Sequence, residues 1–560
     1  MPPTVDMETE AAARLLAQQP LPLGVSLPPG DTHALSVSMP AWEDVVGYEE
    51  GRPHVLAALA AGYPRFFRHP LVRRLEAHLR ETLPAFRQLP GEDWGLMALP
   101  TEAAAQRLVA FLARSPDGAG DGDDDGATAD ARARVTRLEG PDGLVAVVAF
   151  PAALAKAATR FWQHAGEIVS SRHAELLLRA LEHGDAGAAL QLQELRDSAA
   201  HTALRSRVAE LYRDDAVAVD ASDVFLYPTG MSAIFAALRL LTSLEPRRKA
   251  KAVLFGFPYL DTLKMLQRAQ WCPGGVHFFP VGDDRAMEQL EELLRTEPVL
   301  GIFTECPGNP LLSLPDLERL SALARAHDTF LIVDDTIGSY NLNCLQRATA
   351  DVVLTSLAKI FSGTCNVMAG SLVLNPSGRC YAAFKRHLAS TRDAFLLEAD
   401  ARALLDASQH VLQRVARVNA SASLIVERLQ AHPLVKSLFY PSLDAARGRF
   451  DRLRSQRAGP SAAGYGPLLS VVLRGGERVA RAFYDSLHVA KGPSLGTNFT
   501  LACPYTIIAH YYELDFVESC GVDRHLVRVS IGLEDAETLW QLLARALAEA
   551  QRVHDAAAAN

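Results

Sequence analysis

The sequence predicts an α/β protein in which a large domain with a mostly parallel sheet is followed by a smaller α+β domain. Apolar runs of strand length alternate with helical patterns between about residues 222 and 375, and this order of elements builds such a sheet. The runs are continuously apolar, as expected for strands buried on both faces. Polar residues follow several of the runs, where sheets of this kind bind ligands.

The individual elements follow from apolar periodicity and from the residues that interrupt it. The predicted strands of the large domain are 223–228, 252–257, 299–305, 329–335, 350–357 and 370–375. Its predicted helices are 230–244, 287–296 and 315–328, and Pro315 suits the first turn of the last one. Later predicted elements are a helix at 411–430, an apolar run at 467–476, a helix, a loop, a second run at 525–535 and a final helix. We therefore predict three units, 1–215, 216–410 and 411–560.

Composition narrows the classes of partner. The 560 residues suit several domains, and 49% hydrophobic with 22% charged residues is typical of a globular protein. A formal charge of -9 gives no basic surface for nucleic acid or an anionic membrane. Small molecules and other protein chains are the expected partners.

Cysteine usage and hydropathy bear on the compartment. The seven cysteines have no paired spacing, and MPPTVDMETE lacks the basic and then apolar pattern of a signal peptide. The longest uncharged apolar run begins at Leu144, is interrupted by Pro151, and falls short of the ~20 residues that span a membrane. We expect a cytoplasmic protein without a membrane segment.

The N-terminal unit shows mostly helical patterns with loops, and no sheet is predicted there. PDGAGDGDDDG at 116–126 is too polar to bury a core, so we predict a disordered loop near 116–130. Asp121, Asp123 and Asp125 match the start of a calcium loop, but the twelfth position is Arg132 where a glutamate ligand is required. No metal site is predicted.

A polar set lies beyond the predicted strands of the large domain. Asp334 and Asp335 close one strand, Asn309 follows another, and Ser356 and Lys359 follow a third. An aspartate pair or a lysine after a strand is commonly an ordinary turn or a solvated side chain. Their order at successive strand ends favours a shared site.

These residue types suit one cofactor. Burial disfavours the charged form of an amine, so Lys359 among apolar neighbours becomes a nucleophile able to form a Schiff base. A buried acid can pair with a cationic ring nitrogen, and the helix start at Gly230 and Met231 offers N–H groups to a phosphate. With Tyr259 to stack on a ring, this set can hold pyridoxal phosphate.

Four segments carry a resemblance to a known family: PTGMSAI, ECPGNP, VDDT and SLAKIFSG. They resemble S-G-M-A-A-I, E-x-P-x-N-P, V-D-N-T and S-x-T-K of the Cys/Met-metabolism pyridoxal phosphate enzymes, which include cystathionine γ-synthases, γ-lyases and O-acylhomoserine sulfhydrylases. The resemblance implies the aspartate aminotransferase-like fold, called fold type I. It also implies roles for the residues already noted. Asp334 would pair with the pyridine nitrogen, Lys359 would form the Schiff base, Asn309 would belong to the cofactor site, and Ser356, Gly230 and Met231 would bind the phosphate.

Further segments extend the resemblance along the chain. FPYLDT resembles the Y-G-G-T segment, which implies that Tyr259 stacks on the cofactor ring. GPSLGTN and LVRVSIGLED resemble C-terminal family segments, which assigns Ser494 to the substrate pocket and Arg528 to the substrate α-carboxylate. YPRFFRHP resembles Y-S-R-x-x-N-P, an arm by which Tyr63 and Arg65 would reach the phosphate of a neighbouring subunit. A homo-oligomer with shared active sites is implied.

The chain also departs from the family pattern. Ala358 replaces a threonine, Asp335 replaces an asparagine, and Leu260 and Asp261 replace two glycines. A weaker phosphate grip and a reshaped pocket are expected. HALSVSMPAWEDVVGYEEG, KIFSGTCNVMAGS and the spacing of about 150 residues between YPR and PTGM resemble the fungal branch of the cystathionine γ-synthases, with its enlarged N-terminal region.

The favoured function is γ-replacement on an O-acyl-L-homoserine with L-cysteine, which gives L-cystathionine. Sulfhydrylation, γ-elimination, or another nucleophile in fungal specialised metabolism are the alternatives, and a catalytically weak scaffold that binds the cofactor is a third. GPSLG at 492–496 also satisfies the serine-hydrolase motif G-x-S-x-G, but that motif requires a following helix, and TNFTLACPY is extended in pattern.

Overall fold

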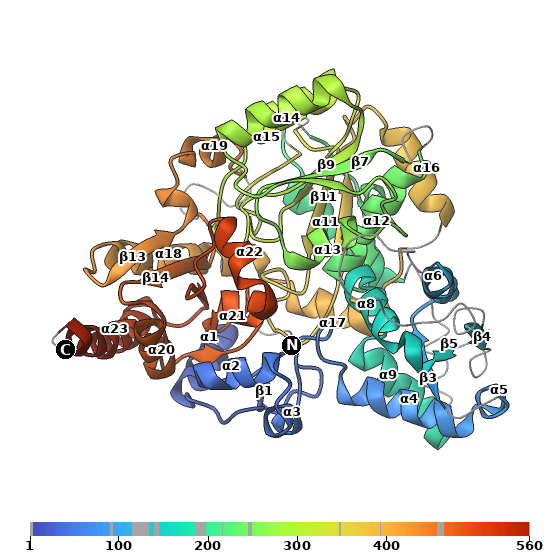
Figure 1. The fold of residues 1–560 in the computed structure, drawn as a ribbon, viewed down its shortest axis with the longest axis horizontal. Helices are drawn as coiled ribbons and strands as arrows, with labels where there is room; N and C mark the ends of the chain where they lie inside the picture. Colours follow the sequence, from blue (N-terminus) through green and yellow to red (C-terminus); the bar gives the residue numbers. More distant parts are fainter. Residues whose placement is uncertain are drawn as a thin grey trace.

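The computed structural model describes residues 4–89, 93–114, 134–138, 145–185, 198–215, 217–244, 249–345, 349–391, 394–455 and 464–558. The loop predicted near 116–130 and the calcium pattern at 121–132 lie outside these ranges. Figure 1 shows the large sheet with its helices, a smaller C-terminal part to its left, and the N-terminal part below both.

The large domain contains a seven-stranded sheet in the order β6-β12-β11-β10-β9-β7-β8. Strand β12 is antiparallel to both neighbours, and the other neighbouring pairs are parallel. This confirms the predicted mostly parallel sheet. The strands are β6 (Val224–Tyr227), β7 (Lys251–Phe255), β8 (Val276–Phe279), β9 (Val299–Glu305), β10 (Leu331–Asp334), β11 (Val352–Ser356) and β12 (Gly370–Leu374). Strand β8 was not predicted: it lies at the sheet edge and is only half-buried, so its short run gives a weak signal.

Helices cover the large sheet on both faces (Figure 1). They are α11 (Ala199–Tyr212), α12 (Gly230–Thr242), α13 (Leu260–Leu266), α14 (Asp284–Thr296), α15 (Leu317–Ala326), α16 (Tyr381–Thr391) and α17 (Glu398–Ala407). Helix α12 packs against β11 and β12 with an almost wholly buried apolar surface. Its position directs its N-terminus toward the carboxyl ends of the parallel strands.

The C-terminal part contains a five-stranded sheet in the order β13-β14-β17-β16-β15. Its strands are β13 (Val435–Phe439), β14 (Leu468–Leu473), β15 (Ala490–Lys491), β16 (Leu501–Pro504) and β17 (Val527–Ser530). Its helices are α18 (Val411–Gln430), α19 (Arg447–Arg452), α20 (Gly476–Ser486), α21 (Tyr505–His510), α22 (Leu514–Ser519) and α23 (Ala536–Ala558). Helices α18 and α20 both pack against α23, which closes a second apolar core behind the sheet.

The prediction of an N-terminal unit without a sheet was wrong. Strands β3 (Trp94–Leu99), β5 (Ala146–Pro151) and β4 (Thr136–Leu138) form an antiparallel sheet in the order β3-β5-β4. WGLMAL and AVVAFP are buried over most of their length, so they lack the polar alternation that distinguishes a half-buried strand from a helix. A short ribbon pairs β1 (Ser26–Leu27) with β2 (Ser36–Val37).

The remaining elements of this part are helical. They are α1 (Val5–Ala17), α2 (Trp42–Glu49), α3 (Pro53–Ala58), α4 (Pro70–Thr82), α5 (Pro84–Arg87), α6 (Glu102–Ala113), α8 (Ala155–Ala165) and α9 (Ser171–His183). Helix α8 packs against α12 and α13, which joins the N-terminal part to the large domain.

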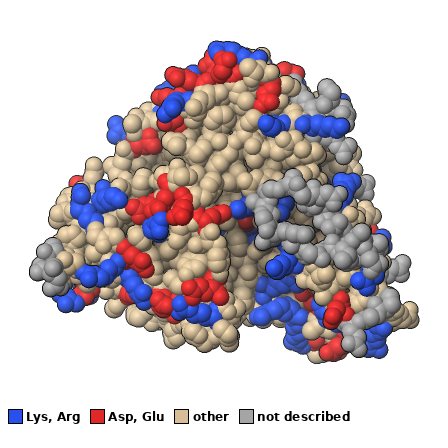
Figure 2. Space-filling view, viewed as in Figure 1, with Lys and Arg blue, Asp and Glu red and all other residues tan. Residues whose placement is uncertain are grey.

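Surface charge and helix hydropathy bear on contacts with nucleic acid and with membranes. On the face shown in Figure 2, basic and acidic side chains are interspersed over most of the surface, and several basic side chains lie together toward the lower right. In the ranges given above, no helix combines the length and the apolar character that a membrane crossing requires.

Candidate functional site

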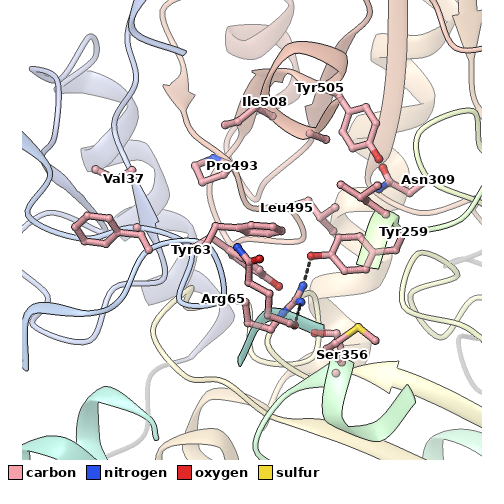
Figure 3. Close-up of a pocket in the computed structure, with 18 of the residues that line it drawn as sticks. Val37, Tyr63, Arg65, Tyr259, Asn309, Ser356, Pro493, Leu495, Tyr505 and Ile508 are labelled. Carbon is pink, nitrogen blue, oxygen red and sulfur yellow. Dashed lines mark hydrogen bonds between the residues drawn. The ribbon is translucent and has the colours of Figure 1, made fainter. Parts of the chain in front are cut away.

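A cavity of about 720 Å³ opens where the carboxyl ends of the large sheet, the C-terminal part and the N-terminal part meet (Figure 3). Its walls contain the predicted site residues, which come from segments that are far apart in the sequence. The nominated residues that line it are Tyr63, Arg65, Gly230, Met231, Tyr259, Asn309, Asp334, Ser356, Lys359 and Arg528. The remaining one, Ser494, contacts Lys359 directly. All of the predicted site residues therefore share one site.

Lys359 is buried, with 8% of its surface exposed. It lies three residues after the end of β11. Its Nζ donates hydrogen bonds to Ser494 Oγ at 3.2 Å and Tyr63 Oη at 3.4 Å, and lies 4.5 Å from the centre of the Tyr63 ring. The amine is thus held by hydroxyl groups inside the cavity, with no carboxylate partner among the described residues.

The N-terminus of α12 forms a narrow cradle against β11. Thr229 caps the helix by accepting the N–H of Ser232 at 2.9 Å, so the N–H groups of Gly230 and Met231 precede the capped one and lie at the cavity wall. A Cβ on Gly230 would lie 2.7 Å from the Cβ of Ser356. Only glycine lets this serine approach the helix start, and together they offer a hydroxyl and helix N–H groups to an anion.

Two acids stand side by side at the strand ends. Asp334 closes β10 and is paired in register with Glu305, which closes β9. Burial, aided by the charge of Asp334, raises the pKa of Glu305 to about 8. Burial also raises the pKa of Asp334, although the backbone N–H of Thr336, 2.9 Å from its Oδ1, opposes the shift. A cation beside this pair would relieve the cost of burying the acids.

The acid pair also organises its surroundings. The carboxylate of Glu305 accepts the backbone N–H groups of Tyr259 and Asn309. Those bonds attach the loops after β7 and β9 to the strand ends. Glu305 was quoted within a family motif but received no role from sequence, because its contacts are with backbone groups that no motif reveals.

Arg528 on β17 faces the cavity from the C-terminal part and is 5% exposed. Its Nη1 donates to Asn309 Oδ1 at 3.3 Å, and its Nη2 donates to the carbonyls of Pro493 and Ser494, each at 3.1 Å. The guanidinium also lies 5.0 Å from the centre of the Tyr505 ring. No described acid forms an ion pair with it, so a buried cation is held ready for an anionic ligand.

Tyr63 and Arg65 enter the cavity of their own chain (Figure 3). Arg65 donates to the hydroxyl of Tyr259 and to Asp261. Burial raises the pKa of Tyr63, but the charges of Lys359 and Arg65 outweigh burial and leave that pKa below its ordinary value.

Other residues of the site were not assigned roles from sequence. Tyr505 and Glu49 line the cavity, and burial raises the pKa of Glu49 to about 8. Asp261 was noted only as a replacement for glycine. Asp261 is a charged residue in an otherwise apolar stretch, and this was the sequence signal for a buried functional role. Its partner, Arg65, lies 196 positions earlier in the chain, so the sequence did not reveal the pair.

The hydrolase motif GPSLG does not form the corresponding structure. Strand β15 precedes it, but a loop and then β16 follow it instead of a helix. Its serine, Ser494, contacts Lys359 and not a histidine. The sequence-based dismissal of a serine hydrolase is therefore confirmed by the local fold.

Comparison with known proteins places these features in a family. The model of the Cys/Met metabolism PLP-dependent enzymes, where PLP is pyridoxal phosphate, matches residues 196–548, and that of the fungal trans-sulfuration enzyme N-terminal domain matches residues 71–170. A cystathionine gamma-synthase of Neurospora crassa is 35% identical over 95% of this chain and 99% of its own. The cystathionine gamma-synthase-like enzyme iboG2 of Amanita muscaria is 36% identical over 95% of this chain and 97% of its own.

A solved structure supports the fold. The cystathionine gamma synthase of Xanthomonas oryzae pv. oryzae, in complex with aminoacrylate and cysteine, superimposes with a TM-score of 0.54 at 23% identity. The match covers 64% of this chain and 87% of that one. Fold type I, predicted from the sequence resemblance, is confirmed.

The residues present fit pyridoxal phosphate. The absence of a Cβ at Gly230 lets Ser356 lie against the start of helix α12, where helix N–H groups and a hydroxyl suit a phosphate, and the acids Asp334 and Glu305 suit a protonated ring nitrogen. The amine of Lys359 lies in the same cavity. Each part of the cofactor therefore finds a chemically matched group.

Proposed function

This chain belongs to the Cys/Met-metabolism family of pyridoxal phosphate-dependent enzymes, and from that premise we propose that it transfers the γ-carbon of an O-acyl-L-homoserine to the thiol of L-cysteine. The product is L-cystathionine. The observation that carries the proposal is the pairing, within one cavity, of the Lys359 amine with a buried Arg528 that lacks a described acidic partner. An amino-acid substrate needs both groups.

Arg528 orients the substrate. Its planar fork suits bidentate binding of an α-carboxylate, and the carbonyls of Pro493 and Ser494 hold the fork in place. Asn309 restrains the other terminal nitrogen. An α-carboxylate bound there would direct the α-carbon toward the part of the cavity that contains Lys359.

Bound pyridoxal phosphate supplies an electron sink for charge that develops at the substrate α-carbon. Lys359 Nζ, freed by substrate, removes the α-proton and later a proton from the β-carbon. Tyr63 and Ser494 position this nitrogen through their hydroxyl groups. Asp334, Tyr259, Ser356, Gly230 and Met231 would hold the cofactor.

The overall reaction is balanced. The bond between the γ-carbon and the acyloxy oxygen breaks, and a bond between the γ-carbon and the cysteine sulfur forms. The thiol proton leaves with the carboxylic acid, and Lys359 returns the protons that it removed. No oxidant or reductant is required.

Purified protein supplied with pyridoxal phosphate should be incubated with O-acetyl- or O-succinyl-L-homoserine, with and without L-cysteine. Cystathionine that forms only when cysteine is present is the expected result. Formation of homocysteine when sulfide is supplied would identify sulfide as the nucleophile. Formation of a 2-oxo acid and ammonia without cysteine would indicate γ-elimination. Either result would contradict the proposed transfer to cysteine. The absence of any turnover by protein that carries the cofactor would contradict the proposal and favour a scaffold.

A second candidate is γ-substitution with a different nucleophile. The Amanita muscaria relative, similar along nearly the whole chain, is named only as cystathionine gamma-synthase-like. In this chain Leu260 and Asp261 also stand where the resembled family has glycines. A panel of thiol and carbon nucleophiles in the same assay distinguishes this candidate by the mass of the adduct. Assembly as a homo-oligomer and a cytoplasmic location also stay proposals, which sedimentation and cell fractionation would test.

A further inference from the structure

Tyr505 is a buried tyrosine that the C-terminal part contributes to the cavity wall. It begins helix α21, and 3% of its surface is exposed. It lines the same cavity as Lys359 and Arg528. Its hydroxyl oxygen is buried and has no hydrogen-bond partner among the described residues. Buried hydroxyl groups are nearly always hydrogen-bonded, so this one, at a cavity wall, indicates a hydrogen bond to a ligand.

The ring of Tyr505 is held on two sides. The guanidinium carbon of Arg528 lies 5.0 Å from the ring centre, and the ring of His510 meets it edge-on with 5.7 Å between the ring centres. His510 is 2% exposed, and its Nδ1 lies 2.9 Å from Glu513 Oε1. The other oxygen of Glu513 accepts the amine of Lys264, on helix α13, at 2.9 Å. The ring therefore has contacts that reach back to the large domain, and the place of its hydroxyl is fixed before a ligand binds.

The hydroxyl of Tyr505 shares one corner of the cavity with Arg528 and Asn309. Figure 3 shows the hydroxyl end of Tyr505 directed toward Asn309, whose Oδ1 accepts Arg528 Nη1 at 3.3 Å. Because the guanidinium lies over the ring, the guanidinium and the hydroxyl at the ring edge border the same space. A cation and a neutral hydroxyl side by side suit an anionic ligand group.

The protonation state of Tyr505 makes it a donor. Burial raises the pKa of its hydroxyl above the ordinary value, and the charge of Arg528 opposes this shift without reversing it. The hydroxyl therefore keeps its proton at neutral pH. A hydrogen bond from a hydroxyl to a carboxylate is charge-assisted and stronger than one between neutral groups. The anion that Arg528 binds is the nearest candidate acceptor.

We propose that Tyr505 is a further substrate-binding residue, whose hydroxyl donates a hydrogen bond to the substrate α-carboxylate bound by Arg528. The ligand class is an L-amino acid with a free α-carboxylate. A site with a fixed donor discriminates strongly against analogues that lack the matching acceptor. The inference deepens the proposed function, because it rests on the amino-acid site at Arg528. It is independent of the acyl group and of the nucleophile.

The experiment measures ligand binding to protein loaded with pyridoxal phosphate. The two ligands are L-2-aminobutyrate, which has the α-carboxylate but no leaving group, and its amide, L-2-aminobutyramide. Tyr505→Phe should weaken binding of L-2-aminobutyrate about tenfold, the usual loss when a hydrogen bond to a charged group is removed. Binding of the amide, which offers no charged acceptor, should change by less than about threefold. Isothermal titration calorimetry measures both dissociation constants.

Tyr440→Phe is the matched control. Tyr440 is also a buried tyrosine of the C-terminal part, but its hydroxyl donates to the carbonyl of Gly466 at 2.9 Å and it does not line the cavity. This variant should leave the dissociation constants of both ligands unchanged. Its melting temperature should fall, because it loses a buried hydrogen bond.

The melting temperature of Tyr505→Phe separates binding from a structural role. Its hydroxyl has no described partner, so the folded protein loses no hydrogen bond and the melting temperature should stay equal or rise. Lower affinity for L-2-aminobutyrate without a loss of melting temperature is the combined result expected. A variant that melts earlier or does not fold would show that the hydroxyl is structural and would overturn the proposal. Unchanged affinity for L-2-aminobutyrate, or equal weakening of both ligands, would overturn it as well.

The outcome does not depend on whether cystathionine forms, because neither ligand carries a group that can leave from the γ-carbon. A selective loss of L-2-aminobutyrate binding in Tyr505→Phe supports the assignment even if the proposed transfer to cysteine fails. Cystathionine formation by a Tyr505→Phe variant with unchanged affinity for L-2-aminobutyrate would uphold the proposed function and reject this role of Tyr505. Wild-type protein that carries the cofactor but does not bind L-2-aminobutyrate would contradict both.

Discussion

The amine of Lys359 lies 3.2 Å from the hydroxyl oxygen of Ser494, although 135 positions separate the two residues. The contact joins the large domain to the C-terminal part beside the cavity that the predicted cofactor-binding residues line. It places the only nucleophilic amine among the described cavity-lining residues beside the loop that also holds Arg528. One short loop, which contains Pro493 and Ser494, therefore contacts both Lys359 and Arg528.

Lys359→Ala should abolish covalent attachment of the cofactor, because no other described cavity-lining residue has a primary amine. Borohydride reduction followed by peptide mass spectrometry measures the attachment site. Lys491 is the matched comparison: it is also buried, burial lowers its pKa to about 8, and it lies 4.7 Å from a tyrosine ring. Its Nζ is bound to the carbonyls of Pro40 and Asp485 outside the cavity. A pyridoxyl group on Lys491, or one retained in Lys359→Ala, would contradict the assignment.

Arg528→Ala should raise KM for the amino-acid substrate and leave cofactor affinity nearly unchanged. Loss of one partner of a desolvated charge pair costs about 2 to 5 kcal/mol, so the change in kcat/KM should be large. Steady-state kinetics and cofactor titration separate the two effects. Arg524→Ala, which removes a surface arginine paired with Asp515 and Glu518, should behave as wild type. An unchanged KM in Arg528→Ala would remove this residue from the substrate site.

Gly230→Ala should destabilise the phosphate cradle. The added methyl group would lie 2.7 Å from the Cβ of Ser356 and 3.0 Å from its Cα, so the strand or the helix must move. Overpacking of this kind costs about 1 to 3 kcal/mol, and cofactor affinity should fall with it. Gly448→Ala, in the exposed helix α19 with its nearest neighbour at 4.0 Å, is the control and should be neutral or slightly stabilising. Equal melting temperatures and cofactor affinities for both variants would show that the cradle tolerates a side chain.

Glu534 should make stability depend on pH. Burial raises its pKa to about 7 from an ordinary value of 4.5, and its carboxyl accepts the N–H and the hydroxyl of Thr500. Between pH 4.5 and pH 7 the folded state keeps a proton on Glu534 that the unfolded state has released. The contribution of Glu534 to the free energy of unfolding is therefore full below pH 4.5 and is lost as pH rises through 7. The melting temperature of the wild type should therefore fall relative to that of Glu534→Gln as pH is raised from 5 to 8. Glu537→Gln, at an exposed ion pair nearby, should not reproduce this trend, and parallel curves for wild type and Glu534→Gln would refute it.

Much of the large domain could be predicted because its signals are local. Continuous apolar runs gave the central strands, and the helix at Gly230 began where it was expected. The N-terminal sheet could not be predicted, since WGLMAL and AVVAFP are buried on both sides and lack a diagnostic period. Strand β8 was missed for a different reason, because it is a short, half-buried strand at the sheet edge.

The sequence by itself determined that Asp334, Ser356 and Lys359 would meet, because residues that follow parallel strands necessarily lie at one edge of a sheet. Only the tertiary structure decided that Arg65 pairs with Asp261 of its own chain and that Arg528 rests on the carbonyl of Ser494. These contacts depend on how segments that are distant in the sequence pack against each other. That packing is set by the shape of buried surfaces, and no local pattern of residues encodes it.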